Sequence, residues 1–353
     1  MKQHISFKIM RTVPVICFFT CSIQSVFGQK NTDLLFNIHP PLEIGLRFSI
    51  KEIRKSKEDS AYINNILYYQ NASGSYDSLK IGIKGRGNFR MQGCYFPPLW
   101  IKLPKKKITG TVFEGNKKLK LVLPCDNKPG NNALILKEYL CYKLYEVITP
   151  YFFKSGLTNI DFTELRGKTV KHFQLKGIFI EDLEKMAQRF QARPLGQVKF
   201  DPMALQDTGA LRFAFFQYMI ANTDWSRKYQ HNTKLIRLSS GDYISIPYDF
   251  DMSGVVDAPY SLVSLVGDEE LNIKNVRERL YRGWCRSEAV TQFVRNEFLS
   301  KQAELLSIPD MVAGELPDKE IKAIKDYLKF FFETIKDEDS FKENIIDQCR
   351  NAD

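Results

Sequence analysis

The sequence lacks most of the short motifs that identify a chemistry at sight. It has only four histidines in 353 residues and no C-x-x-C pair, so a structural zinc site is not expected. A G-x-G-x-x-G or Walker phosphate loop is absent, as is the G-x-S-x-G elbow of α/β-hydrolases. Internal repeats and low-complexity segments are missing too, which favours ordinary globular folding.

Long hydrophobic runs are also absent. The first 28 residues read as a signal peptide, with Lys2, Lys8 and Arg11 before an apolar run at 13–20 that is too short to span a bilayer. A membrane anchor or a buried helix is the alternative. Cleavage before Gln29 lowers the formal net charge from +10 to +7 and leaves no transmembrane segment. We therefore expect an exported protein with a moderate basic bias, which suits a nucleotide or a surface polyanion rather than nucleic acid.

Cysteine is sparse in the part of the chain expected to fold. Removal of residues 1–28 leaves an odd number of widely spaced cysteines, which allows one or two disulfides in an oxidising compartment. Their pairing stays open: Cys94, Cys125, Cys141, Cys285 and Cys349.

Hydrophobic periodicity divides the chain into two halves. Residues 29–181 are β-rich with one helix, and residues 182–353 are mainly helical. Antiparallel strands are expected at 42–50, 61–69, 79–83, 96–103, 118–124, 157–162 and 170–180, and helices at 131–148, 202–221, 272–306 and 318–338. This layout predicts a two-lobed α+β fold with a β-rich N-lobe and a helical C-lobe.

The richest stretch for chemistry spans residues 220–251. Asp224 follows an amphipathic helix, Asn232 comes eight residues later, and Asp249 and Asp251 follow Pro247. One carboxylate can orient or deprotonate a hydroxyl, while an amide and a carboxylate hold Mg²⁺ against phosphates. On an extended segment, Asp249 and Asp251 would share one face and attract a cation. A capped helix end, an Asx turn and a solvated acidic turn are the alternatives.

Several of these motifs, in this order, resemble the CotH-type family, the spore-coat-protein-H kinases. The resemblance covers roughly residues 79–256. It rests on Arg86-Gly87-Asn88, Phe96-Pro97-Pro98 with Lys102, Asp126, Glu181, Asp224, Asn232 and Pro247 with Asp249 and Asp251. The chain departs from the family at Phe89, where Ser or Thr is common, and at Lys137-Glu138, where an Arg is frequent.

The resemblance implies a role for each matching residue. Asp224 would orient the acceptor hydroxyl or take its proton. Asn232 and Asp249 would hold Mg²⁺ (or Mn²⁺), with Asp251 as a second ligand or an orienting group. ATP would be bound by Arg86, by Lys102 or else Lys120, by Glu138 as the partner of that lysine, and by Glu181.

The function expected from these motifs is that of an exported kinase. It would transfer the γ-phosphoryl group of ATP to Ser or Thr hydroxyls of a secreted or cell-surface protein. A catalytically inactive binding module and a phosphotransferase acting on a sugar are the competing hypotheses. The geometric expectation is that Asp224, Asn232 and Asp249 converge on a space facing Lys102 or Lys120. His172 and His231 are interpreted as structural, although His231 adjoins Asn232.

Overall fold

A computed structural model describes Met1 and residues 33–58, 61–87, 89–264 and 271–351. The chain divides into two compact units, Met1–Thr32 and Asp33–Asp353, and the described helices and strands all belong to the second. The predicted signal peptide and Asn88 of the R-G-N motif lie outside the described residues.

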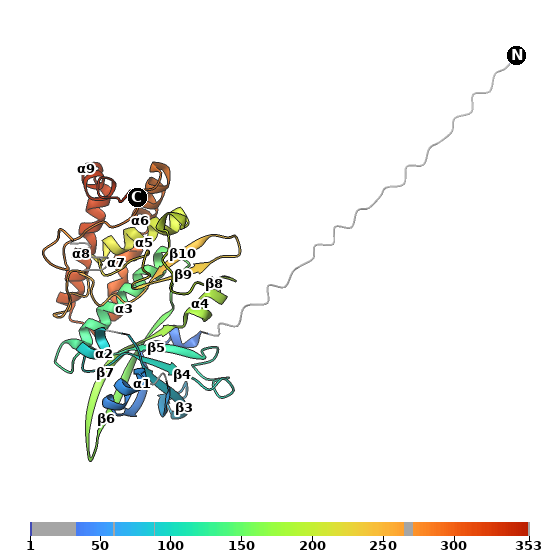
Figure 1. Cartoon of the computed structure of the whole chain (residues 1–353), viewed down its shortest axis with the longest axis vertical. Helices are drawn as coiled ribbons and strands as arrows, with labels where there is room; N and C mark the ends of the chain where they lie inside the picture. The colour runs from blue at the N-terminus through green and yellow to red at the C-terminus, as the bar shows by residue number, and fades with distance from the viewer. Residues whose placement is uncertain (2–32, 59–60, 88, 265–270, 352–353) are drawn as a thin grey trace. The chain divides into compact units, whose positions relative to one another are not determined.

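The strands of the first half form a closed barrel (Figure 1). Its order is β1-β2-β3-β4-β5-β7-β6. The strands are β1 (Leu42–Phe48), β2 (Ile63–Gln70), β3 (Tyr76–Gly85), β4 (Leu99–Lys102), β5 (Lys118–Val122), β6 (Ser155–Arg166) and β7 (Thr169–Glu181). Alternate residues of β1 and β6 are buried inside the barrel, as the alternation of their sequences predicts.

The predicted two-lobed, kinase-like fold is wrong, because the β-rich half is a closed mixed barrel with helices packed beside it. Closure comes from a parallel pairing of β1 with β6, in register from Leu42 opposite Thr158 to Phe48 opposite Glu164. The purely antiparallel expectation fails at this one pair. The periodicity of a strand indicates which face is buried but not which distant strand lies beside it, so this pairing is not readable from either strand.

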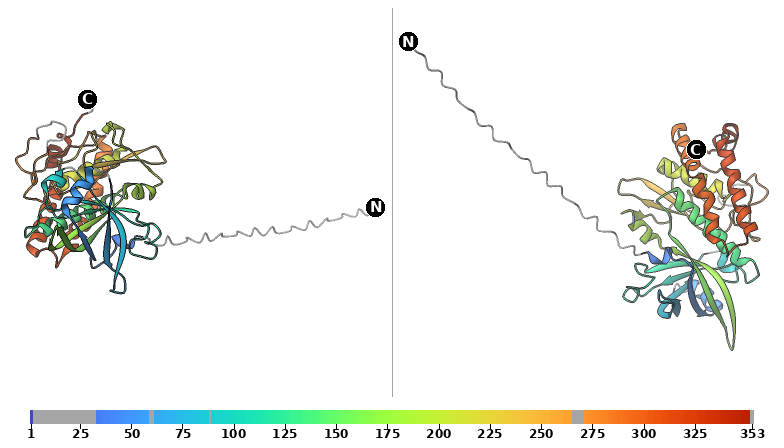
Figure 2. Two further views of the ribbon diagram at one scale, coloured as in Figure 1. Left: turned by 60° about the horizontal axis from the view of Figure 1, so that its bottom comes forward. Right: turned by 180° about the vertical axis from the view of Figure 1, so that it is seen from behind.

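The helical part packs against one side of the barrel (Figures 1 and 2). Its longer helices are α3 (Asn131–Ile148), α5 (Asp207–Met219), α6 (Glu288–Ser300) and α8 (Asp318–Lys336). The shorter ones are α4 (Leu183–Gln188), α7 (Gln302–Ser307) and α9 (Glu338–Phe341), with single turns at Pro202–Ala204, Ile308–Val312 and Lys342–Ile346. A small sheet of β8 (Arg193–Pro194), β9 (Thr233–Arg237) and β10 (Tyr243–Pro247) joins them. On the barrel side lie α1 (Ile50–Glu58), α2 (Phe89–Gly93) and a turn at Leu34–Phe36.

Helix predictions succeeded where the pattern was long and bounded. The helices predicted at 131–148 and 318–338 are confirmed as α3 and α8, and the one at 202–221 becomes a turn capped by Asp201 followed by α5. The helix predicted from residue 272 is wrong, because α6 begins only at Glu288. In the described residues before it, Arg279 and Arg282 donate hydrogen bonds to the backbone carbonyls of Met219, Tyr327, Thr223 and Trp225. These side-chain contacts anchor the non-helical segment to α5, to the loop after it and to α8.

The core has two main parts that meet at one wall of the barrel. Side chains pointing into the barrel, such as Ile83 and Phe162, form one cluster. The other surrounds α3 and α5, and it includes Val122, Ile178 and Ile180 from the outer face of β5 and β7. The outer face of β5 and β7 is thus covered by the helical part. Among the described residues, no helix is long and apolar enough to cross a membrane.

Two disulfides tie distant segments together. Cys94 pairs with Cys125, Cys285 pairs with Cys349, and Cys141 is a buried free thiol. The first joins the end of α2 to the segment after β5, and the second joins the segment before α6 to the C-terminal end. The tertiary structure therefore decides the pairing that the spacing left open.

We expect the double variant Cys285→Ser/Cys349→Ser to lower the free energy of unfolding by about 4 kcal/mol, because the bond closes a long loop in the unfolded chain. Urea denaturation followed by circular dichroism measures it. Alkylation of the unfolded, unreduced chain beginning at Gln29 is the control, and it should label one cysteine against five after reduction. Labelling of all five without reductant would contradict both pairings.

Candidate functional site

The loop after α5 carries Asp224 and is anchored to the core by buried side chains. Trp225 is buried and donates from its indole nitrogen to the carbonyl of Asn222 (2.9 Å). Arg227 is buried against the rings of Phe213 and Trp225 and donates to a carbonyl of α5. The backbone nitrogen of Asp224 donates to the side chain of Asn222 (3.0 Å). The loop is therefore held rigidly while the carboxylate of Asp224 keeps about a fifth of its surface exposed.

Three side chains donate hydrogen bonds to Asp224. Asn232 Nδ2 lies 2.8 Å from Oδ2, while His231 Nε2 and Ser264 Oγ lie 3.0 and 3.1 Å from Oδ1. Asn232 has a positive φ of 47°, which turns its side chain back across the loop. The hydrogen bond that His231 donates to Asp224 raises the pKa of His231. The structure thus brings together Asp224 and Asn232, eight residues apart, and adds His231 as a positioning residue.

Asp249 and Asp251 are not arranged as the extended-strand argument predicted. β10 ends at Pro247, and Asp249 has a φ of 67°, in the left-handed region. The backbone nitrogen of Asp249 donates to the hydroxyl of Tyr142 on α3 (3.0 Å). Phe250 packs between Tyr142 and Phe216. Asp249 is left partly exposed and Asp251 buried, because the ring between them is inserted in the core.

Asp251 belongs to a buried ion cluster. Arg90 of α2 lies between two carboxylates, with Nη1 3.5 Å from Glu138 and 3.8 Å from Asp251, and it donates to the carbonyl of Leu123. Burial raises the pKa of Glu138 to about 8 and that of Asp251 to about 7, and neighbouring carboxylates, Asp249 among them, add to both shifts. Burial therefore favours the neutral, protonated forms of these two carboxyl groups, and the charge of Arg90 opposes that shift.

Glu138 was expected to pair with a lysine on a strand, and this expectation is corrected: its partner is Arg90. Within the described residues, Oε1 of Glu138 and Nε of Arg90 have no hydrogen-bond partner. Arg90 sits at the end of the Arg86-Gly87-Asn88 segment, and sequence reasoning did not single it out. No local signal marks it, since an arginine on a short helix is usually solvated.

Of the two candidate lysines, Lys120 is the one that lies near Asp249. Its ammonium group is buried, lies over the rings of Phe153 and Tyr248, and has no hydrogen-bond partner in the described part of the chain. Burial lowers the pKa of Lys120, and the nearby cations Arg86 and Lys234 lower it further. Asp182 and then Asp249 lie close enough to oppose that shift.

Lys102, the first choice from sequence, lies elsewhere. It is exposed on β4 beside Tyr62 and opposite Lys118 of β5. Lys102 and Lys120 both point out of the barrel, but only the stretch of β5 around Lys120 is covered by the helical part. Arg86, in contrast, joins the cluster: it lies over Trp100, and its charge acts on Lys120, Glu138 and Lys234.

Glu181 is also separate from the cluster. It is fully buried, pairs with Arg189 (2.9 Å) and accepts from the backbone nitrogen of Lys154 (3.2 Å). Lys154 and Lys185 in turn pair with Asp33. Glu181 therefore has partners of its own at the end of β7.

Lys234 on β9 lies near Lys120 and Arg86, two residues after Asn232 in the sequence. Sequence reasoning missed it because a lysine on a hairpin strand is ordinarily solvated.

The oxygen donors of Asn232, Asp249 and Asp251 have the chemistry that Mg²⁺ prefers. Across the described ranges, no group of three or more His, Cys, Asp or Glu side chains is placed to hold a metal ion. Mg²⁺ commonly binds through one or two carboxylates together with water and phosphate oxygens, so a preformed protein cage is not required. The buried, under-neutralised carboxylates Glu138 and Asp251 fit a nearby cation.

We expect Arg90→Met to lower the free energy of unfolding by about 3–5 kcal/mol, because it leaves Glu138 and Asp251 buried without their counter-ion. Guanidinium denaturation measures this loss. The double variant Arg90→Met/Glu138→Gln is the matched comparison and should recover part of it, since one buried charge goes with the other. Equal stability of Arg90→Met and the unsubstituted chain would rule out a buried ion cluster.

No protein-family model matches the chain, and a search of curated proteins finds no match.

Proposed function

We propose that this chain is an exported, ATP-dependent phosphotransferase that acts on Ser or Thr hydroxyls of a secreted or cell-surface protein. One observation carries the proposal: uncompensated charge of both signs lies side by side. Among the described residues, no acidic side chain forms an ion pair with Arg86, Lys120 or Lys234, and next to them Asp249 and Asp251 share too little positive charge. A nucleotide with its divalent cation supplies an anion for the first group and a cation for the second.

The cationic side of the cluster suits the phosphates. The ammonium of Lys120 is buried and has no hydrogen-bond acceptor among the described residues, so an anionic oxygen would satisfy it at little further desolvation cost. Arg86 and Lys234 would add charge from β3 and β9. Lys102 and Glu181, placed elsewhere in the fold, have no part in this binding.

The acidic side suits the metal. Asn232, Asp249 and Asp251 would hold Mg²⁺ or Mn²⁺, which when bound neutralises charge on the transferred phosphoryl group. Asp249 is held by its backbone bond to Tyr142 and by the insertion of Phe250 in the core. This anchoring fixes the position of its carboxylate before any ligand binds.

Asp224 is the residue proposed to act on the acceptor. Its carboxylate is partly exposed and is oriented by Asn232, His231 and Ser264. It would accept a hydrogen bond from the incoming hydroxyl and receive its proton as the phosphoryl group transfers. The same bond from Asn232 links the position of Asp224 to the proposed metal ligands.

The two disulfides support export. Disulfides persist in oxidising compartments and are rare in reducing ones, so the pairs Cys94–Cys125 and Cys285–Cys349 agree with a signal peptide at residues 1–28.

Incubation of the chain beginning at Gln29 with γ-labelled ATP and Mg²⁺ or Mn²⁺ tests the proposal. We expect label on serine or threonine of the chain itself or of added secreted proteins, and a nucleotide-dependent rise in the unfolding temperature. A thermal shift without transfer would favour a binding module, and transfer to sugars alone would favour a small-molecule phosphotransferase. Absence of both effects would refute the proposal.

A further inference from the structure

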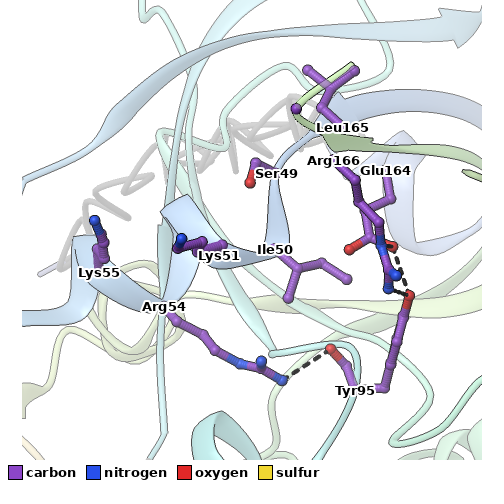
Figure 3. Close-up of a pocket in the computed structure, with 10 residues that line it drawn as sticks. Ser49, Ile50, Lys51, Arg54, Lys55, Tyr95, Glu164, Leu165 and Arg166 are labelled. Atoms are coloured by element: carbon purple, nitrogen blue, oxygen red, sulfur yellow. Dashed lines mark hydrogen bonds and ion pairs between the residues drawn. The ribbon is translucent and has the colours of Figure 1, made fainter. Parts of the chain in front are cut away.

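A second charged site lies on the barrel, away from the buried ion cluster and the Asp224 loop. It is a cavity of about 620 Å³ between the start of α1, the segment after α2, and the tip of the β6–β7 hairpin (Figure 3). That hairpin tip points away from the helical part in Figures 1 and 2. None of the residues lining the cavity belongs to the candidate phosphotransfer site.

Cations dominate the lining. Lys51, Arg54 and Lys55 come from α1, at spacings that place them one helical turn apart, and Arg166 comes from the end of β6. In the described part of the chain, neither Lys51 nor Lys55 forms an ion pair or a side-chain hydrogen bond. The buried side chains of Ile50 and Ile53 hold α1 in place, so the charges are presented on a fixed helix.

Tyr95 positions the two guanidinium groups. Arg54 donates from Nη2 to the carbonyls of Cys94 (2.7 Å) and Tyr95 (3.4 Å), and Arg166 donates to the hydroxyl of Tyr95. Figure 3 shows both arginines reaching Tyr95 from different elements. Cys94 is also held by its disulfide to Cys125. The guanidinium groups of Arg54 and Arg166 are therefore held in place before any ligand binds.

Glu164, the one acidic residue among the described residues that line the cavity, already has partners within the protein. Glu164 is buried, accepts from the hydroxyl of Tyr95 (2.6 Å) and pairs with Arg166 Nε (2.9 Å). Four cationic side chains thus face one carboxylate, and that carboxylate balances Arg166 alone. The positive charge of Lys51, Arg54 and Lys55 remains uncompensated within the described residues.

We propose that this cavity binds a tetrahedral oxyanion, a phosphate or sulfate group carried on a larger polar molecule. Arginine forks match the oxygens of such groups, and lysines add point charge. A doubly charged group would neutralise the excess better than a single carboxylate, and the cavity has room for a sugar-sized carrier. The proposal does not depend on phosphotransfer at the other site.

The test is calorimetric titration of the chain beginning at Gln29, in low-salt chloride buffer, with inorganic phosphate, inorganic sulfate, a hexose 6-phosphate and a hexose 6-sulfate. Lys51→Gln/Lys55→Gln removes two exposed lysines of the cavity and should weaken binding at least tenfold. Lys105→Gln/Lys106→Gln removes two exposed lysines from a distant turn and should leave binding within twofold.

A second readout places the ligand. Bound oxyanion should protect Lys51 and Lys55, but not Lys105, from amine acetylation as measured by mass spectrometry. Tighter binding of either ester than of its inorganic ion supports the proposal and identifies the carrier chemistry. Binding of the inorganic ions but of neither ester means an adventitious ion only and overturns it. Equal weakening in both lysine pairs, or no binding at all, also overturns it.

Discussion

Lys120→Met should weaken nucleotide binding by about 30-fold or more while making the free protein more stable. Truncating one partner of a desolvated charge contact costs about 2–5 kcal/mol of binding, and 1.4 kcal/mol corresponds to a factor of ten. In the free protein the same ammonium is buried over Phe153 and Tyr248 with no acceptor among the described residues. Methionine fills the space without that desolvation cost, so the free energy of unfolding should rise by about 1–2 kcal/mol.

The opposite signs of these two effects make the prediction specific. If Lys120 had only a structural role, its substitution would lower the free energy of unfolding. If it were solvated, substitution would change neither the nucleotide affinity nor the free energy of unfolding. Isothermal titration with ATP and Mg²⁺ measures the first effect, and urea denaturation without nucleotide measures the second. Lys102→Met is the matched control: it makes the same chemical change on the exposed part of the barrel, and both quantities should stay within error.

If Lys120→Met binds ATP as tightly as the unsubstituted chain, the cationic side of the proposed site is wrong. If Lys102→Met loses binding instead, the nucleotide binds on the outer surface of β4, and the arrangement argued from buried charge does not operate.

Asp224→Ala should lower phosphoryl transfer by about 10³-fold and leave nucleotide affinity within about threefold. General-base assistance contributes roughly 10²–10⁴ in rate, and this carboxylate is partly exposed and held in place by its neighbours. The alanine also removes the acceptor of His231 and one of the two acceptors of Asn232, which keeps its bond to the backbone carbonyl of residue 224, so a loss of about 1–3 kcal/mol in stability is expected. Rates should therefore be measured well below the unfolding temperature.

The readouts for this variant are single-turnover transfer and ATP titration. Asp242→Ala, on the exposed turn between β9 and β10, is the control and should transfer at the original rate. Undiminished transfer by Asp224→Ala would remove this residue from the mechanism. Loss of affinity together with loss of rate would instead assign it to nucleotide or metal binding.

The sequence predicted well those features that depend on neighbours along the chain. Helix α3 extends from Asn131 to Ile148 as its apolar spacing indicates, and Pro150 lies just beyond its end. The closeness of Asp224 and Asn232 also follows from a short connection, since only seven residues separate them and the loop folds back on itself. In these cases the signal and the structure lie within one element or one loop.

The remaining features depend on contacts between distant segments. Lys102 and Lys120 have equivalent strand environments, and only the packing of the helical part over β5 distinguishes a buried cation from a solvated one. The partner of Glu138 is Arg90, 48 positions earlier, because α2 is tethered there by the disulfide from Cys94 to Cys125. The i, i+2 spacing predicted that Asp249 and Asp251 would lie on one face. Because the backbone at Asp249 is left-handed, the segment is not an extended strand, and Asp249 is partly exposed while Asp251 is buried.

The sequence by itself thus determined helices α3 and α8, the residues of the Asp224–Asn232 loop, and a basic balance that suits anionic ligands. Only the tertiary structure decided that the strands close into a barrel through β1 and β6, which cysteines pair, and which charged side chains are buried together. The physical reason is the same in each case. Periodicity and turn residues act over a few positions, whereas burial, charge pairing and strand closure are set by surfaces that come together only when the chain has folded.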